Sequence, residues 1–140
     1  SSKWGLMIKI QKRSFNIERE IKAIKDNLND VGAVSTFIGY VRDINKNKKV
    51  KSIYLEVYPE MAKKYLNDLS KKIKKKWGLS DILIIHRFGN LKINDKIVLV
   101  AVFSMHRESG IKACTQIMNY LKKDAPFWKQ EKYTENKRWL

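Results

Sequence analysis

The 140-residue sequence has little cysteine, little proline and no long apolar run. Its single cysteine, Cys114, excludes a disulfide within the chain and a zinc site built from several thiolates, as is typical of proteins of the reducing cytosol. No stretch approaches the roughly 20 apolar residues of a membrane-spanning helix, and the first residues lack the pattern of a secretory signal. We therefore expect a cytoplasmic protein that does not enter the membrane.

Acidic residues are also scarce: 14 Asp and Glu stand against 30 Lys and Arg, a formal net charge of +16. Such an excess attracts polyanions, phosphorylated small molecules or an acidic protein partner, without choosing among them. Much of it lies in two runs, Lys46–Lys51 and Lys71–Lys76, which lack the interleaved aromatic residues of a nucleic-acid platform. A solvated face explains both runs, and a basic nucleic-acid-binding module is the alternative from another functional class.

Apolar periodicity predicts an α+β fold in a single domain, residues 1–140. Strands are predicted at 7–11, 32–41, 52–58, 82–88, 97–103 and 128–134, and helices at 16–28, 59–77 and 108–124. This order, without linker or repeat, favours a mainly antiparallel sheet. The segment 32–41 is almost continuously apolar, so we expect it to be covered on both faces. The segment 43–49 has nothing to bury and is expected to be an exposed, mobile loop.

The start of the helix predicted at 108–124 has the features of an anion site. His106 and Arg107 immediately precede its first turn, where free backbone N–H groups and the helix dipole already favour negative charge. This combination suits a phosphate, although a surface ion pair and a core hydrogen bond would explain the same two residues. Arg42, directly after the strand at 32–41, is a further candidate anion contact, and arginine at such a position is also common as plain surface.

The end of the same helix carries a candidate catalytic lysine. At about 100° per residue, Lys122 shares a helix face with Ile111, Thr115 and Met118. A lysine held against apolar surface can act as a general acid, an anchor for an anion or a nucleophile. Stabilisation of the helix dipole explains it equally well. The segment that follows would let the chain turn back and bring Lys129 near Lys122.

The two ends of this helix are too far apart to serve one small ligand. Glu108 and Lys122 are 14 residues apart, which corresponds to roughly 21 Å of helix. If both ends belong to one active site, they must come from two copies of the chain, and a symmetric homodimer is the simplest arrangement. Cys114 lies on the apolar side of the helix without an evident base, so we expect a core residue rather than a sulfur carrier.

In their order and spacing, these residues resemble the large subunit of molybdopterin synthase over residues 32–139. The resemblance is carried by Gly32-Ala33-Val34, Phe37, Gly39, Val41-Arg42, Leu55-Glu56, Tyr58, Met61, His86-Arg87, Gly89, Leu91, His106-Arg107, Lys122, Ala125-Pro126-Phe127-Trp128-Lys129 and Glu131. Asn94 departs from the glycine usual in the family, and Gly110 from the usual alanine. The resemblance implies an α/β hammerhead fold with a small additional antiparallel β subdomain.

The resemblance also implies a function, a sulfurtransferase of molybdenum cofactor biosynthesis. Such an enzyme takes sulfur from the C-terminal Gly-Gly thiocarboxylate of a small ubiquitin-like subunit. It transfers the sulfur to cyclic pyranopterin monophosphate, giving the dithiolene of molybdopterin without metal or redox cofactor. The implied assembly is a heterotetramer around a homodimer of large subunits. A non-catalytic scaffold that only docks the ubiquitin-like protein is the alternative within this resemblance.

The resemblance assigns roles to six residues. Lys122 matches the family's catalytic lysine and Lys129 its supporting partner. Arg42, His106 and Arg107 match anion-binding residues, of which His106 and Arg107 are expected to come from the opposite protomer. Arg138, near the end of the chain, is a further candidate for substrate binding.

Overall fold

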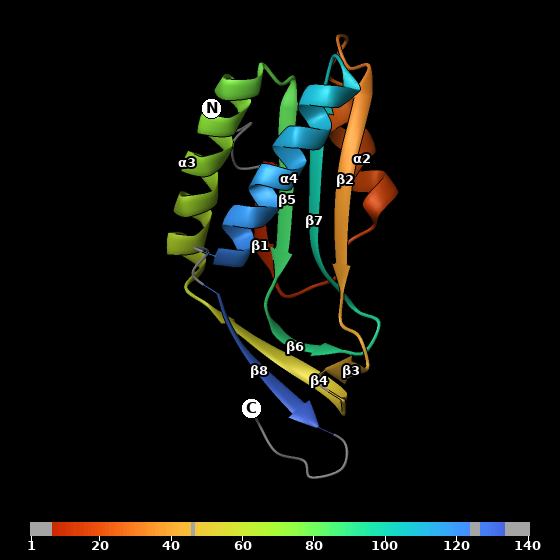
Figure 1. Cartoon of the computed structure of the whole chain (residues 1–140), viewed down its shortest axis with the longest axis vertical. Helices are drawn as coiled ribbons and strands as arrows, with labels where there is room; N and C mark the ends of the chain where they lie inside the picture. Colours follow the sequence, from red (N-terminus) through yellow and green to blue (C-terminus); the bar gives the residue numbers. More distant parts are fainter. Residues whose placement is uncertain (1–6, 46, 124–126, 134–140) are drawn as a thin grey trace.

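The computed structural model describes residues 7–45, 47–123 and 127–133. Figure 1 shows a main sheet with α3 and α4 on one face, α2 on the other, and a smaller sheet at one end. The main sheet has the order β1 (Ile8–Gln11), β5 (Asp81–Arg87), β7 (Lys96–Ser104), β2 (Ala33–Tyr40). Only the β1–β5 pairing in this sheet is parallel, so the prediction of a mainly antiparallel sheet is confirmed.

Residues that the sequence marks begin helices α2 and α3 and end α3, whereas α2 ends at Lys25, three residues before the predicted end. At α2 (Ile17–Lys25), the Asn16 side chain accepts a hydrogen bond from the Arg19 amide at 2.8 Å. Pro59 opens α3 (Pro59–Trp77), and Gly78 ends it in the left-handed conformation with φ 61°. The third helix, α4, spans Arg107–Lys123. Within the described part of the chain, no helix is both long and apolar enough to cross a bilayer.

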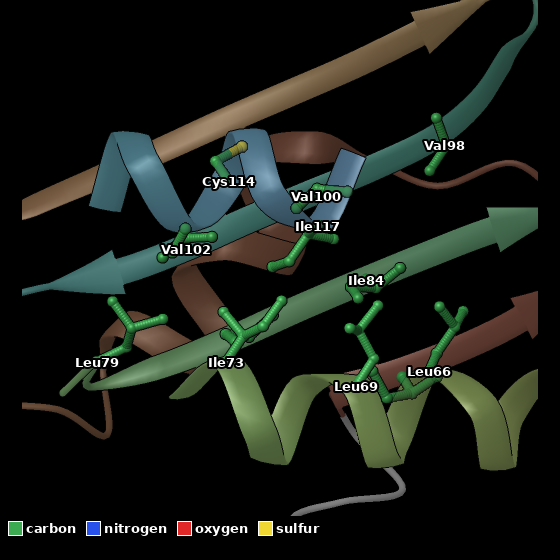
Figure 2. Packing of buried hydrophobic residues seen from close by; sticks show 13 residues of the cluster. Leu66, Leu69, Ile73, Leu79, Ile84, Val98, Val100, Val102, Cys114 and Ile117 are labelled. Carbon is green, nitrogen blue, oxygen red and sulfur yellow. The ribbon is translucent and has the colours of Figure 1, made fainter. Parts of the chain in front are cut away.

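Two apolar layers hold the helices on the main sheet. Figure 2 shows the larger, in which leucine and isoleucine side chains of α3 and α4 meet the valines and isoleucines of β5 and β7. Cys114 belongs to this layer, and burial raises the pKa of its thiol. The prediction of a core cysteine is therefore confirmed. On the other face, α2 packs against a second layer that includes Leu83, Leu99 and Phe103.

The smaller sheet is the additional antiparallel subdomain that the resemblance implies. Its strands are β3 (Ile44–Asn45), β4 (Lys48–Val57), β6 (Gly89–Lys92) and β8 (Phe127–Tyr133), and β4 pairs with each of the other three. Leu91 of β6 is fully buried in its core, beside Ile53 and Leu55 of β4. In this sheet the first residues of β8 lie beside the last residues of β4.

The expectation of a loop at residues 43–49 is wrong. Two antiparallel backbone pairs lie there, Ile44 with Lys49 and Asn45 with Lys48, so β4 begins at Lys48 rather than at Ser52. Asn47 occupies the left-handed region with φ 66°, a conformation that asparagine tolerates in turns. Backbone pairing on an established strand needs no apolar side chains, so the absence of an apolar pattern did not exclude a strand.

The expectation that residues 32–41 are covered on both faces is also wrong within one chain. Among the strands of the described residues, β2 pairs with β7 alone and therefore lies at the edge of the main sheet. Val34 keeps 37%, Phe37 41% and Tyr40 51% of its surface exposed. The apolar run is therefore a strand at the sheet edge with partly exposed side chains in the single chain. Residues of this strand also line the candidate site.

His86 and Arg87 close β5 and make hydrogen bonds with the backbone around them. The buried Arg87 guanidinium donates to the backbone carbonyls of Lys12 and Lys96, each at 3.0 Å, and thereby joins the ends of three strands. The His86 Nδ1–H donates to the Arg87 carbonyl at 2.8 Å. Burial lowers the pKa of His86 to about 4, although this hydrogen bond acts in the opposite direction.

The lowered pKa of His86 predicts loss of stability in mild acid. Between pH 6.5 and about 4, His86 is protonated in the unfolded chain but remains neutral in the folded chain. The free energy of unfolding therefore falls as the pH decreases through this window. The contribution reaches about 3 kcal/mol. Denaturant unfolding at pH 7.5 and pH 4.5 should show a smaller pH-dependent loss for His86→Gln than for the wild type. The exposed histidine provides the matched control, since His106→Gln should keep the wild-type difference.

Candidate functional site

A groove runs between the edge strand β2 and helix α4, with a volume of about 560 Å³. Its walls are mainly apolar and include Val34 and Phe37 of β2 and Ile111 and Met118 of α4, while Arg107 lines it at the start of α4. The predicted face of Lys122, which contains Ile111, Thr115 and Met118, is thus the face of α4 that borders this groove.

Small residues fix the turn that presents His106 and Arg107. Ser104, fully buried at the end of β7, donates its Oγ–H to the His106 carbonyl at 2.7 Å, and its own carbonyl accepts from the Gly32 amide at 2.9 Å. A Cβ on Gly32 would stand 2.2 Å from the Met105 carbonyl oxygen, a contact that no side chain permits. His106 and Arg107 are exposed on this fixed turn.

A glycine on α4 brings the helix close to the sheet just after this turn. A Cβ on Gly110 would lie 2.6 Å from the Ser104 Oγ and 2.9 Å from the Ser35 Oγ. Gly110, which stands where the family usually has alanine, therefore permits an unusually close approach of α4 to β2 and β7. Ser104 could not be predicted from the sequence, because a serine at the end of a strand belongs to no recognisable pattern.

Lys122 lies in the last turn of α4 and is exposed, as is Lys123. Both lysines are therefore exposed in the single chain. They differ in direction, because their side chains leave the helix about 100° apart. Arg42 is exposed and follows Val41, whose backbone is held by hydrogen bonds to Asp95 and Asn94. Figure 1 shows that β2 and α4 end toward the same end of the main sheet, so Arg42 and Lys122 share that end.

Single-chain geometry therefore divides the candidate residues into two cationic groups. His106 and Arg107 lie at the start of α4 and Lys122 at its end, about 22 Å apart along the helix axis for 15 residues. The backbone of Lys129 pairs with Leu55 in the smaller sheet. Arg138 lies outside the described residues.

Among the residues that the structure describes, no three His, Cys, Asp or Glu side chains gather so that they could hold a metal ion. The chemistry available at both ends of α4 is that of fixed positive charge, which binds phosphate and carboxylate and stabilises developing oxyanions.

Comparison with known sequences gives consistent matches over most of the chain. The model of the family described as MoaE protein matches residues 10–124. The molybdopterin synthase catalytic subunit of Ralstonia nicotianae is 44% identical over 133 residues, covering 95% of this chain and 76% of the relative. The protein of the same name from Vibrio cholerae is 41% identical, covering 95% of this chain and 88% of the relative.

Solved structures share the fold. Molybdopterin synthase from Staphylococcus aureus superposes with a TM-score of 0.83 at 32% identity, covering 94% of this chain and 95% of that one. Molybdopterin cofactor biosynthesis protein E from Burkholderia multivorans gives 0.81 at 36% identity, covering 96% and 86%. Because the family model spans α2 through the end of α4 and the named relatives align over nearly the whole length, the chain belongs to the MoaE protein family.

Proposed function

We propose that the chain acts as the catalytic subunit of a molybdopterin synthase. On this proposal it transfers sulfur from the C-terminal thiocarboxylate of a small ubiquitin-like subunit to cyclic pyranopterin monophosphate, and two transfers produce the dithiolene. The observation that carries the proposal is the family match over residues 10–124, together with catalytic subunits up to 44% identical that align over 95% of the chain. A cytoplasmic location agrees with the buried single thiol and is part of the same proposal.

The cationic groups at the two ends of α4 suit this chemistry. The thiocarboxylate, the substrate phosphate and the oxyanions that develop during transfer are all negative. In the proposed roles, Lys122 and Lys129 stabilise the reacting groups, whereas Arg42, His106 and Arg107 hold the phosphate. Arg138 is retained as a further proposed substrate contact. These roles require that groups about 22 Å apart in one chain meet in one pocket.

A second copy of the chain brings the groups together if it occupies the groove. The open edge of β2 offers unpaired backbone groups, and the exposed Val34, Phe37 and Ile111 offer an apolar surface beside it. Antiparallel pairing of β2 with its copy about a two-fold axis would reverse the direction of the second α4. The start of that helix, with its His106 and Arg107, would then lie near Lys122 of the first copy.

Replacing Phe37 with aspartate should therefore shift the protein from dimer to monomer. Phe37 lines the groove and keeps 41% of its surface exposed, so the charge would be buried without a partner in a dimer but would remain solvated in a monomer. Mass measurement by light scattering or analytical ultracentrifugation at micromolar concentration checks this. Tyr120→Asp is the matched control, since Tyr120 on α4 is 39% exposed and does not line the groove. A Phe37→Asp dimer as tight as the wild type would exclude this interface.

A small subunit is the second partner in the proposal. A Helicobacter pylori structure of the same fold, 19% identical with a TM-score of 0.78, is described as a complex of subunits 1 and 2 of molybdopterin-converting factor. That description concerns the H. pylori protein, and for this chain it agrees with the proposal of a second subunit as partner. The ubiquitin-like fold of that subunit and the heterotetramer are part of the proposal.

Reconstitution tests the proposed function directly. The chain is incubated with a thiocarboxylated ubiquitin-like protein and cyclic pyranopterin monophosphate, and the dithiolene is detected after oxidation to a fluorescent pterin derivative. The same protein ending in an ordinary carboxylate is the control and should give no product, because it carries no sulfur. Binding of the thiocarboxylated protein without product would favour the non-catalytic scaffold over the enzyme.

A further inference from the structure

The backbone of Arg42 is held on both sides, although its side chain is exposed. On one side, the buried Val41 donates its N–H to the Asp95 carbonyl at 2.9 Å, and its own carbonyl accepts from the residue before Asp95 at 2.7 Å. On the other side, the Asp43 carbonyl accepts from the Val50 N–H of β4 at 2.6 Å. The point at which the Arg42 side chain leaves the backbone is therefore set by contacts with both sheets.

The turn between β6 and β7, residues 92–95, is closed by the carboxylate of Asp95. Its Oδ2 accepts a hydrogen bond from the Lys92 N–H at 2.8 Å, and the Asp95 N–H donates to the Lys92 carbonyl at 3.0 Å. Between them, Asn94 adopts the left-handed conformation with φ 72°. Figure 1 shows the connection of β6 and β7 beside the chain that leaves the end of β2. We call residues 92–95 the β6–β7 turn. The turn that holds Val41 therefore depends on one side chain as well as on its backbone.

The buried guanidinium of Arg87 fixes the same carboxylate from a second direction. Its Nη1 lies 3.9 Å from the Asp95 Oδ2 and donates to the carbonyl of the next residue, Lys96, at 3.0 Å. Only 10% of the Arg87 side chain is exposed. A buried cation without a nearby anion is costly, so this ion pair favours one position of the β6–β7 turn relative to β5.

We infer that Asp95 is a positioning residue for Arg42, the candidate phosphate contact, and that it acts through the β6–β7 turn and Val41. The inference rests on the proposed function and concerns substrate binding in the same site. An arginine binds phosphate best through two parallel N–H···O bonds, a geometry that tolerates little displacement. The Asp95 carboxylate itself is used by the Lys92 N–H and by Arg87, so its effect on the substrate is indirect.

Substrate titration of Asp95→Ala tests the inference. Initial rates of dithiolene formation in the reconstituted complex, measured over a range of pterin concentrations, give kcat and KM. Loss of the carboxylate should raise KM roughly tenfold and keep kcat within about twofold of the wild type, because Arg42 holds the phosphate rather than the reacting groups. A merely structural role of Asp95 would lower the melting temperature without changing KM.

Combination with Arg42→Ala shows whether Asp95 acts through Arg42. Arg42→Ala should itself raise KM, because it removes the phosphate contact. Adding Asp95→Ala should then raise KM no further, since the group to be positioned is already absent. If the two increases in KM instead multiply, Asp95 acts independently of Arg42 and the inference is overturned.

Asp81→Ala is the matched control. The Asp81 carboxylate also accepts from a backbone N–H, that of Ile82 at 2.9 Å, and also lies near a cation, 3.8 Å from the Lys74 Nζ. It stands at the start of β5, whereas Arg87 ends that strand. Asp81→Ala should therefore lower the melting temperature and keep the KM of the wild type.

Asp95→Asn takes the place of Asp95→Ala if the alanine variant fails to fold. The amide oxygen can still accept from the Lys92 N–H while the ion pair with Arg87 is lost, so KM should rise about threefold. A wild-type KM in the folded variant would overturn the positioning role and leave the proposed function intact. Absence of dithiolene with the wild-type chain would overturn the proposed function and this inference with it.

Discussion

Lys122→Ala is expected to lose nearly all dithiolene formation while keeping the fold, the dimer and the affinity for the small subunit. The Lys122 side chain is exposed in the last turn of α4, so its removal leaves no core cavity. In the assembled pocket the same ammonium would stabilise the oxyanions of sulfur transfer, and removal of one such group typically costs about 100- to 1,000-fold in rate. Initial rates of product formation at saturating pterin measure the effect.

The neighbouring residue provides the control for this variant. Lys123 has the same chemistry and is also exposed, but it lies about 100° farther around the helix and away from the groove face. Lys123→Ala should therefore retain a rate close to that of the wild type. Equal losses in the two variants would indicate a general effect of positive charge, and turnover near the wild-type rate in Lys122→Ala would exclude the assigned role.

The parts of the fold set by local chemistry could be predicted from the sequence. Asn16, Pro59 and Gly78 mark helix ends through hydrogen bonding, a missing N–H and a left-handed conformation, which are properties of the residues themselves. Asn94 likewise adopts φ 72°, as expected for asparagine in place of glycine in a tight turn. These features depend on a few neighbouring residues, so they can be recognised from the sequence without the tertiary structure.

The parts set by long-range contacts could not be predicted in the same way. An apolar run such as residues 32–41 is compatible with burial by the chain itself or by a copy of the chain, and periodicity does not distinguish the two. The antiparallel pairing at residues 44–49 depends on β4 being an established strand. Ser104 matters through one hydrogen bond to the turn before α4, and nothing in its neighbours in sequence indicates that bond.

The candidate site depends both on local helix geometry and on long-range contacts. Helix geometry alone places Lys122 on the face of Ile111, Thr115 and Met118, and the structure shows that this face borders a groove. The same geometry separates Lys122 from Arg107, and no rearrangement within one chain shortens a continuous helix. Whether the two meet therefore depends on a second copy, which makes sharing of the site between copies the decisive property to test.

Mixing two inactive variants should restore activity if the site is shared. Lys122→Ala and Arg107→Ala each remove one group from every site of their own homodimers. A hybrid dimer with one chain of each kind has one site lacking both groups and one site with both intact. Random exchange of subunits at equal concentrations makes about half of the dimers hybrid, so about a quarter of all sites become wild type.

The expected rate of the exchanged mixture is therefore about a quarter of the wild-type rate, well above that of either variant alone. Exchange is verified by mass spectrometry of intact dimers that carry one isotopically labelled chain. Activity should rise with the measured hybrid fraction and should stay absent when the variants are mixed without exchange. If Lys122 and Arg107 instead served one site within a chain, every chain in the mixture would lack one of them. Full exchange without recovery would then exclude a site built from two copies.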